Sequence, residues 1–224
     1  MGERWCDIRH ALAENPLTIL ALALLAVLFA AAVFGPWLAP YDPLATNTAM
    51  ALRPPSAVHP FGTDQLGRDI FSRVVVATRL DLAIAAGAVA LSLGVGAVIG
   101  AACGYFGGTL DRAVGRLVDV LIAFPLFALG MVMAAALGNS VSSVVYATAV
   151  INVPFYIRLA RAETGVRRDM GYVEAARVGG SSHTRVLRVV LLPNIAPPLA
   201  VQASVNLGWA VLNAAGLSFI AKLL

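Results

Sequence analysis

The sequence predicts an all-α, polytopic membrane protein. Of its 224 residues, 59% are hydrophobic and only 12% are charged, and the mean hydropathy is +0.82. Soluble globular chains carry about 25% charged and about 45–50% apolar residues, so a single water-exposed fold would leave much of this apolar surface unburied. Charged residues are also missing from four stretches that each exceed the roughly 20 residues a helix needs to cross a bilayer. The excess apolar surface is therefore expected to face lipid.

The uncharged stretches place the predicted helices in order. They run over residues 15–41, 82–110, 120–157 and 191–220. The third stretch is long enough for most of two spans, and Gly138-Asn139-Ser140 divides it where a tight turn is favoured. The resulting prediction is five helices, over residues 17–38, 82–104, 113–137, 141–160 and 196–218.

The arginines predict which side of the membrane each segment faces, because cytoplasmic segments of membrane proteins retain positive charge. With the N-terminus inside, the inner segments hold 11 of the 16 basic residues and the outer segments hold 5. The outer arginines lie near Asp64, Asp69 and Asp81, carboxylates that can pair with some of them. The prediction is therefore a cytoplasmic N-terminus, with residues 39–79 outside (the outer segment) and residues 158–193 inside (the inner segment).

The chain is expected to have two parts. Residues 1–79 hold the N-terminal tail, the first helix and the outer segment, and residues 80–224 form a core domain that contains the inner segment. The first helix is predicted to be a retained anchor, because its apolar run exceeds the about 7–15 residues of a signal-peptide core and ends in the aromatic cluster 34–38. The outer segment is expected to be ordered and extended, and its stretch 70–78 is amphipathic and suited to the interface.

The inner segment has the residues of a structured knob. Residues 169–178 favour a helix, Gly179-Gly180 can turn the chain, and Ser181 or Ser182 can cap a second short helix that runs to Val190. Two short helices at an angle would form the knob. Composition alone favours the alternative of a solvated loop whose arginines merely follow the positive-inside rule.

Motifs for catalysis, cofactors and metals are missing from the sequence. The chain has no phosphate-binding glycine loop with Lys and Ser or Thr, no His-Glu-x-x-His and no Gly-x-Ser-x-Gly. The glycine-rich run Gly104–Gly108 ends a predicted span and is expected to form a turn. The cysteines and histidines lack partners at metal-ligand spacing, so the histidines are expected to be ordinary surface residues. These residues are Cys6, Cys103, His10, His59 and His183.

Asp119 is the ionisable residue that lies clearly within a predicted span. An acid inside a membrane is a functional candidate, but Arg116 lies three residues earlier on the same helix face and offers a local ion pair. A structural pair is therefore favoured over substrate binding. Pro125, deeper in the same span, is expected to bend the helix.

The spacing of residues in the inner segment resembles the signature of the membrane permeases of bacterial ATP-binding-cassette (ABC) importers. That signature is Glu-Ala-Ala, three residues, Gly, nine residues, and then an aliphatic residue, any residue, Leu and Pro. The matching positions here are Glu174, Ala175, Ala176, Gly180, Val190, Leu192 and Pro193. Val190 is a mild departure, because the family often has isoleucine there.

Other stretches resemble the same family, in particular the subunit of dipeptide, oligopeptide and nickel importers that begins with one helix and an outer segment. They follow the family's order over nearly the whole chain. These stretches are residues 15–17, 38–43, 59–73, 104–108, 116–119 and 215–219.

The resemblance implies both a fold and a set of partners. The fold would be that of a type I ABC importer permease, paired with a second permease subunit above two cytoplasmic ATPase subunits. An extracytoplasmic solute-binding protein would deliver the solute, a peptide first, with nickel or a glutathione-like solute as alternatives. ATP hydrolysis would belong to the ATPase subunits, so this chain would be a transport subunit and not an enzyme. It would lie among the lipids of the bacterial inner membrane, with no cofactor and no nucleic-acid partner.

The resemblance also implies a role for the knob, here about Tyr172 to Arg188. In the family it sits in a groove of the ATPase and transmits the closure of that subunit to the helices. Gly180 would let the knob bend, and the small Ala175 and Ala176 would let the partner surface approach. The ATPase-coupling residues implied are Tyr172, Glu174, Ala175, Ala176, Arg177, Gly180, Val190, Leu192 and Pro193.

The residues by themselves leave other functions open. A gradient-driven secondary transporter or a channel would need no ATPase, but such proteins usually show unwound spans or paired repeats with buried ion-binding groups, and the predicted spans have few such groups. An intramembrane enzyme would need paired catalytic residues, which the spans lack. The outer segment has two equally favoured roles, receiving the binding protein and packing against the second permease.

The family has six spans, whereas five are predicted here. Family members continue past the 215–219 stretch with a further outer segment and a sixth span, so we expect a truncated permease whose C-terminus lies outside. The side of the fifth helix with Gly208, Ala210 and Ala214 would then lack a neighbour, since membrane helices pack through small residues of this kind.

Overall fold

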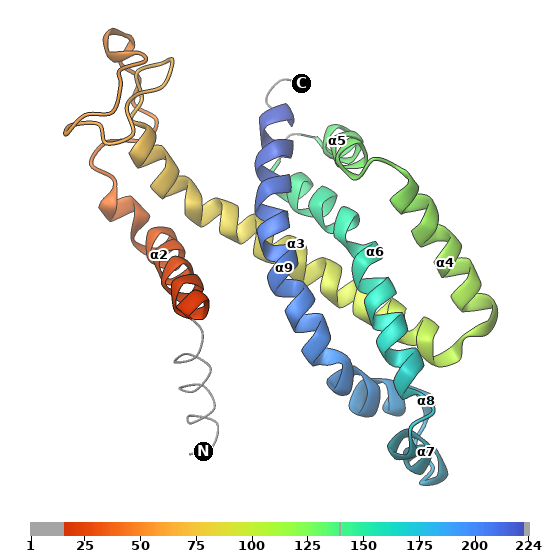
Figure 1. Cartoon of the computed structure of the whole chain (residues 1–224). Coiled ribbons are helices and arrows are strands. Elements are labelled where there is room, and N and C mark those ends of the chain that lie inside the picture. The colour runs from red at the N-terminus through yellow and green to blue at the C-terminus, as the bar shows by residue number, and fades with distance from the viewer. Residues whose placement is uncertain (1–15, 139, 222–224) are drawn as a thin grey trace. The chain divides into compact units, whose positions relative to one another are not determined.

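Helices make up the regular structure of the chain in the computed structural model, which describes residues 16–138 and 140–221 (Figure 1). Those residues contain no β-strand, so the all-α prediction is confirmed. The N-terminal tail, with Cys6 and His10, and Asn139 of the predicted turn lie outside the described residues. The elements are α2 (Pro16–Leu38), the 3₁₀ turn η1 (Thr48–Met50), α3 (Ile70–Phe106), α4 (Gly108–Ala123), α5 (Leu126–Leu137), α6 (Val141–Arg167), α7 (Gly171–Val178), α8 (His183–Arg185), the π-helical η2 (Val186–Leu191) and α9 (Leu192–Ala221).

Within residues 16–138 and 140–221, four helical stretches are long and apolar enough to cross a membrane, which confirms a polytopic protein. They are residues 16–38, 70–106, 141–167 and 183–216. A fifth span would be made by α4 and α5 together, which meet at 95°. The predicted bend of the 113–137 helix at Pro125 is confirmed, and it is sharp enough to divide the span into α4 and α5 at Phe124-Pro125, where the proline has no N–H with which to continue the helix.

The helix α3 starts well before the predicted span 82–104. The stretch 70–78, expected to lie separately in the interface, forms the first turns of α3. Charged residues within 70–81 lower the local hydropathy and so shifted the predicted boundary, but a charged side chain does not end a helix. The sequence has no glycine or proline between residues 70 and 86 to break it.

The elements α8, η2 and α9 form one continuous helical run from His183. Its start is capped by Ser182, whose hydroxyl accepts a hydrogen bond from the backbone N–H of Arg185 at 3.4 Å, so the predicted serine cap is confirmed. The predicted end at Val190 is wrong. Pro193 follows the π-helical η2, whose wider turn makes room for a ring that would collide with a carbonyl of a regular α-helix.

The described chain divides into two compact units, residues 1–82 and 83–224. In the first unit, the side chains of α2 are mostly exposed, as expected of a helix surrounded by lipid. Its buried residue is Gly35, which lies against the backbone of Val75 in α3. A methyl group added to Gly35 would lie 2.7 Å from the Val75 carbonyl oxygen, so the two helices touch through their backbones there.

The loop of the outer segment, residues 39–69, folds back on itself. Backbone hydrogen bonds join its two sides, for example from the Asn47 N–H to the Leu66 carbonyl at 3.0 Å. Gly67 has a left-handed backbone (φ +71°) and lies against the backbone of Asn47, where any side chain would collide. The loop is therefore ordered by its own backbone.

Asp64 fixes the end of this loop. It accepts hydrogen bonds from the backbone N–H groups of Leu66 at 2.9 Å and Arg68 at 3.0 Å, and it forms ion pairs with Arg68 at 2.8 Å and with Arg73. Partial burial raises the pKa of Asp64, but these hydrogen bonds and the charge of Arg68 outweigh that effect and lower the pKa to about 2. The predicted pairing of outer arginines with a nearby aspartate is confirmed at Asp64.

Asp69 is paired with a histidine. Its carboxylate lies 2.9 Å from Nδ1 of His59 and accepts hydrogen bonds from the backbone N–H and the hydroxyl of Ser72 at 2.8 and 2.7 Å. The His59 side chain is only 13% exposed. The prediction of an ordinary surface histidine is therefore wrong for His59, because the folded loop brings a carboxylate ten residues away onto its ring.

In the second unit, α3 and α6 pack backbone to backbone. Gly96, Gly100 and Gly104 lie on one face of α3 at intervals of four residues. A methyl group added to Gly100 would lie 2.8 Å from the Ala160 Cβ, and one added to Gly104 would lie 2.9 Å from the Thr164 Cβ. Small residues let membrane helices approach this closely.

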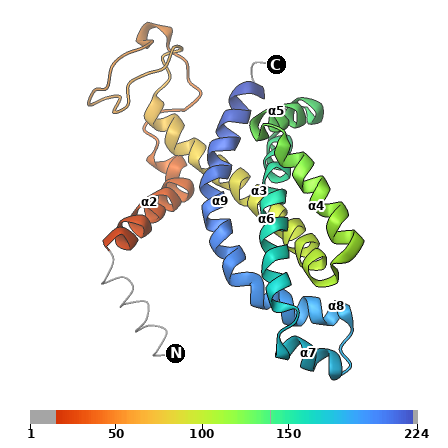
Figure 2. The same cartoon turned by 45° about the vertical axis from the view of Figure 1, so that its right-hand side comes forward.

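The helix α6 runs between α9 and α4, and α5 lies toward the end of α6 that is away from α7 and α8 (Figures 1 and 2). Side chains of α3, α6 and α9 form two apolar clusters that include Ala210 and Ala214, which are 0% and 1% exposed. The prediction that this side of the last helix lacks a neighbour is therefore wrong for both alanines. Gly208, by contrast, has open space around its Cα.

Candidate functional site

The inner segment forms a helical corner beyond the end of α6 (Figure 2). The chain passes from α6 into α7 and turns at residues 179–182 before α8 begins. Gly180 has a left-handed backbone with φ +78°, whereas Gly179 has φ −71°. The turn therefore requires glycine at Gly180 only. The predicted pair of helices around a glycine turn is confirmed, although the second continues into α9.

An apolar cluster holds this corner together. Its buried members are Tyr105 in the last turn of α3, Val173 in α7, and Val186 and Leu191 in η2. Two residues of the signature, Ala176 and Val190, pack against the same cluster. A third, Leu192, is half-buried against the core of the second unit. These three residues face the protein, so their contribution is to fix the shape of the corner.

The other residues of the predicted coupling set are exposed. They are Tyr172, Glu174, Ala175, Arg177, Gly180 and Pro193. Most lie on α7 or in the turn that follows it, next to Val178, whose side chain is 83% exposed. The corner therefore presents a mixed surface with an aromatic ring, a carboxylate, a methyl group and an exposed valine.

Polar groups join both sides of the corner to α3. Nε of Arg177 in α7 donates a hydrogen bond to the Tyr105 hydroxyl at 3.2 Å, and Nδ1 of His183 in α8 lies 2.8 Å from the same oxygen. The Arg177 guanidinium carbon is also 4.9 Å from the centre of the Tyr105 ring. We call these three residues the Tyr105 bridge.

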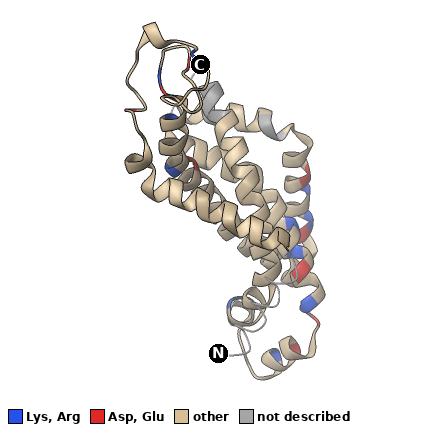
Figure 3. Cartoon of the chain, turned by 60° about the vertical axis from the view of Figure 1, so that its left-hand side comes forward, with Lys and Arg blue, Asp and Glu red and all other residues tan. Residues whose placement is uncertain are grey.

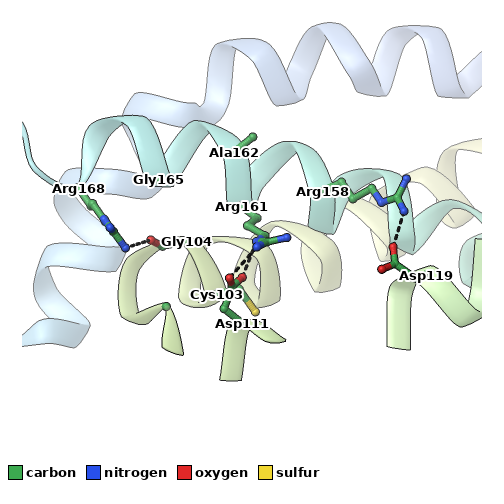
Figure 4. Close-up of a pocket in the computed structure, with 10 residues that line it drawn as sticks. Cys103, Gly104, Asp111, Asp119, Arg158, Arg161, Ala162, Gly165 and Arg168 are labelled. Atoms are coloured by element: carbon green, nitrogen blue, oxygen red, sulfur yellow. Dashed lines mark hydrogen bonds and ion pairs between the residues drawn. The ribbon is translucent and has the colours of Figure 1, made fainter. Parts of the chain in front are cut away.

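Charged residues gather where α4 runs along α6 (Figure 3). Arg161 of α6 pairs with Asp111 of α4, with Nη2 and Oδ2 2.6 Å apart, and Arg158 pairs with Asp119 at 2.6 Å (Figure 4). The predicted pair between Asp119 and Arg116 is wrong. The partner comes instead from the neighbouring helix, which sequence spacing along one helix does not reveal.

These ion pairs line a pocket of about 600 Å³ next to the end of α3. Arg168 reaches its wall and donates to the Gly104 carbonyl at 3.4 Å (Figure 4). Both carboxylates on the wall are already paired with arginines, so the pocket has no unpaired acid with which to bind a cation. The described part of the chain also has no group of three His, Cys, Asp or Glu residues that could hold a metal ion.

Comparison with known proteins decides the family. The model of the binding-protein-dependent transport system inner membrane component matches residues 96–223. The chain belongs to this family. A second model, the N-terminal TM domain of oligopeptide transport permease C, matches residues 3–55. The chain is therefore a multi-pass permease subunit of the bacterial inner membrane, a transport subunit rather than an enzyme.

Similar proteins extend the match over most of the chain. The probable D,D-dipeptide transport system permease protein of Escherichia coli is 40% identical over 92% of this chain and 69% of its own length. The dipeptide transport system permease protein of Alkalihalophilus pseudofirmus is 36% identical over 96% of this chain and 71% of its own length. The nickel transport system permease protein of Escherichia coli is 37% identical over 90% of this chain and 73% of its own length.

Two residues of the inner corner are not predicted from the sequence. Tyr105 lies in a glycine-rich run that is typical of a simple turn, and His183 has no sequence neighbour that indicates a partner. The two are 78 residues apart, so no local pattern links them. The one available signal was the resemblance of the run 104–108 to the permease family, which singled out Tyr105 without a role.

Proposed function

We propose that this chain is the membrane-spanning permease subunit of an ATP-driven ABC importer, and that the inner segment couples it to cytoplasmic ATPase subunits. The observation that carries the proposal is the exposed surface of α7, where Tyr172 is 40% exposed and Glu174 and Ala175 lie beside it. Family membership supports the same assignment, because the exposed surface coincides with the permease signature. The partners would be a second permease subunit, two ATPase subunits and an extracytoplasmic solute-binding protein.

The predicted coupling residues divide into two roles in this proposal. The exposed residues Tyr172, Glu174, Ala175 and Arg177 supply the surface that the ATPase contacts. The inward-facing Ala176 supports that surface from the apolar cluster; Val190 and Leu192 hold the start of the last helix in the same way. Gly180 provides the turn that lets α7 lie at an angle to α8. The segment would act mechanically, with ATP hydrolysis left to the partner subunits.

The solute is proposed to be a small peptide. Two of the three relatives described above are dipeptide permeases by name, and the third is a nickel permease. A nickel complex or a glutathione-like thiol is therefore the competing solute. Uptake of a labelled dipeptide and of ⁶³Ni²⁺ by cells with and without this chain separates the two.

A cross-linking experiment tests the proposed ATPase contact. A photoreactive amino acid at Tyr172 should cross-link to an ATP-binding-cassette subunit in native membranes, because this side chain lies on the exposed surface of α7. The matched control is the same amino acid at Leu212, which is 67% exposed on α9 and should give no such product. Equal yields from the two positions would contradict the proposal.

The alternative, a gradient-driven transporter or channel, makes the opposite prediction about energy. Uptake by the proposed importer should stop with vanadate, an inhibitor of the ATPase cycle, and should survive a proton ionophore while cellular ATP is maintained. A secondary transporter would respond in the reverse way. Vanadate-resistant, ionophore-sensitive uptake would therefore reject an ATP-driven importer.

A further inference from the structure

The inner corner is attached to the membrane helices in two different ways. The helices α6 and α9 are joined to it through the chain itself, α6 leading into α7 and α8 continuing into α9. The helix α3 is distant in sequence and meets the corner through side chains. Any displacement of α7 therefore reaches α6 and α9 covalently, whereas its direct route to α3 is through those side-chain contacts.

Tyr105 provides the polar part of these contacts. It is 6% exposed and stands in the last turn of α3, where its hydroxyl lies between α7 and α8. Arg177 donates to this hydroxyl, and the same hydroxyl forms a hydrogen bond with Nδ1 of His183, in which the histidine tautomer decides the donor. One hydroxyl thus bonds to both sides of the glycine turn at once.

The aromatic rings add to the same contact. The Tyr105 and His183 ring centres are 5.7 Å apart in an edge-to-face arrangement, and the Phe106 ring lies 4.9 Å from Tyr105 and 5.8 Å from His183. The end of α3 therefore contacts His183 of α8 through the Tyr105 and Phe106 rings, and it contacts α7 through the hydrogen bond from Arg177 to Tyr105. By contrast, a methyl group added at Gly180, in the turn between α7 and α8, would have no heavy atom within 4 Å.

Movement of the end of α3 would not remain local. Gly100 and Gly104 bring the α3 backbone against Ala160 and Thr164 of α6, and Arg168 donates to the Gly104 carbonyl. Interfaces packed this closely shift as units and do not deform smoothly. A displacement of Tyr105 would therefore shift α3 and α6 together along their contact.

We propose that Tyr105 is a positioning residue for coupling, which ties both sides of the inner corner to α3 so that displacement of α7 moves α3 together with α6 and α9. This inference rests on the proposed function of the inner segment. A purely apolar role for the ring is the competing explanation. The two differ at one atom, the phenol oxygen, because Tyr105→Phe keeps the ring and removes both hydrogen bonds.

The first test uses the full chain alone in detergent and follows backbone hydrogen exchange. Tyr105→Phe should raise the exchange rates of the α7 and α8 amides roughly fivefold, the size expected from losing one or two hydrogen bonds, and leave the middle of α6 unchanged. The matched control is Tyr172→Phe, which removes an exposed phenol from the same corner and should change nothing. Unchanged exchange rates in Tyr105→Phe would show that the hydrogen bonds of the Tyr105 hydroxyl do not hold α7 and α8, which would overturn the proposal.

The second test uses the importer assembled in lipid nanodiscs with its second permease, ATPase subunits and binding protein. Tyr105→Phe should leave assembly and basal ATP hydrolysis intact and reduce the stimulation by liganded binding protein at least about threefold. His183→Asn should retain the stimulation, because the Asn side-chain amide can replace Nδ1 either as acceptor from or as donor to the phenol. Full stimulation in Tyr105→Phe would overturn the positioning role.

The outcomes separate this inference from the function on which it rests. Failure of the wild-type chain to associate with any ATPase subunit would reject the proposed function and the inference together. Normal assembly with full stimulation in Tyr105→Phe would reject the inference and leave the proposed function intact. In the chain alone, an equal rise in amide exchange for Tyr172→Phe would also reject it, since that phenol is outside the bridge.

Discussion

The outer loop and the inner corner, which both lie between predicted membrane spans, are stabilised in contrasting ways. The loop of the outer segment (39–69) is fixed by polar groups of the loop and of the first turn of α3, with Asp64 accepting from two backbone N–H groups and pairing with Arg68 and with Arg73 of α3. The inner corner is fixed by an apolar cluster and by one phenol of α3. The outer loop is therefore locked by its own backbone, whereas the inner corner depends on a helix distant in sequence.

The left-handed glycines show the same difference. Gly67 of the outer loop lies so close to Asn47 that a side chain has no space, whereas Gly180 of the inner corner has nothing within 4 Å of an added methyl group. Both need glycine for their backbone angle, but only the first also needs it for packing. A crowded turn suits a segment that keeps one shape, and an open turn suits a segment that moves against a partner.

Substitution of the crowded glycine should give the largest effect. Gly67→Ala combines a left-handed backbone with a collision against the Asn47 backbone, so we expect a loss of about 3 kcal/mol of stability. For a chain of this length that corresponds to a fall of roughly 6–12 °C in melting temperature in detergent. Gly180→Ala serves as the control, because it has the cost of the left-handed backbone without a collision. Its melting temperature should fall by a few degrees only. Equal losses would remove the distinction between the two turns.

The polar lock of the outer loop should be visible as a pH dependence. The pKa of Asp64 is lowered from 3.8 to about 2 in the folded chain, so its stabilisation is complete above pH 3.8 and is lost as the pH falls toward 2. The expected contribution at neutral pH is about 2 kcal/mol. Melting curves of wild type and Asp64→Asn should differ at pH 7 and converge near pH 2. A difference that stayed constant with pH would show that the carboxylate charge is unimportant.

The open turn of the inner corner should affect function more than stability. Gly180→Val places a branched side chain in a left-handed backbone at a cost of about 1–2 kcal/mol, with no collision, so the chain should still insert and melt close to wild type. Solute uptake should nevertheless fall several-fold, because the angle between α7 and α8 would change. Uptake and ATPase association equal to wild type would contradict the proposed need for this turn.

Much of the fold was predictable because hydrophobicity and glycine act locally. The 16–38 helix, the turn at Gly180 and the Ser182 cap each depend on residues adjacent in sequence. Errors arose where a local signal misled. Charges near 70–81 obscured a continuous helix, and the short helix predicted to run to Val190 instead continues through a π-helical turn into α9.

The candidate site was predictable as a position in the chain but not as a set of contacts. The permease signature located the corner, yet sequence alone did not divide its residues into the exposed Glu174 and Ala175 and the inward-facing Ala176 and Val190. That division depends on which side of a short helix meets Tyr105. The ion pair of Asp119 was mispredicted for the same reason, because its partner Arg158 comes from a helix distant in sequence.

The ion pairs between α4 and α6 should give the smallest effect and calibrate the comparison. The side chains of Asp119 and Arg158 are 68% and 52% exposed, so a double-mutant cycle with Asp119→Asn and Arg158→Gln should give a coupling free energy below about 1 kcal/mol that shrinks with added salt. The pair of Asp111, 19% exposed, with Arg161 should couple more strongly in the same cycle. A coupling above about 2 kcal/mol for Asp119 and Arg158, unaffected by salt, would mean that this surface of α4 and α6 is shielded from water. In that case polar pairs would hold α4 and α6 together as firmly as Asp64 holds the outer loop, and the contrast between the outer loop and the inner corner would fail.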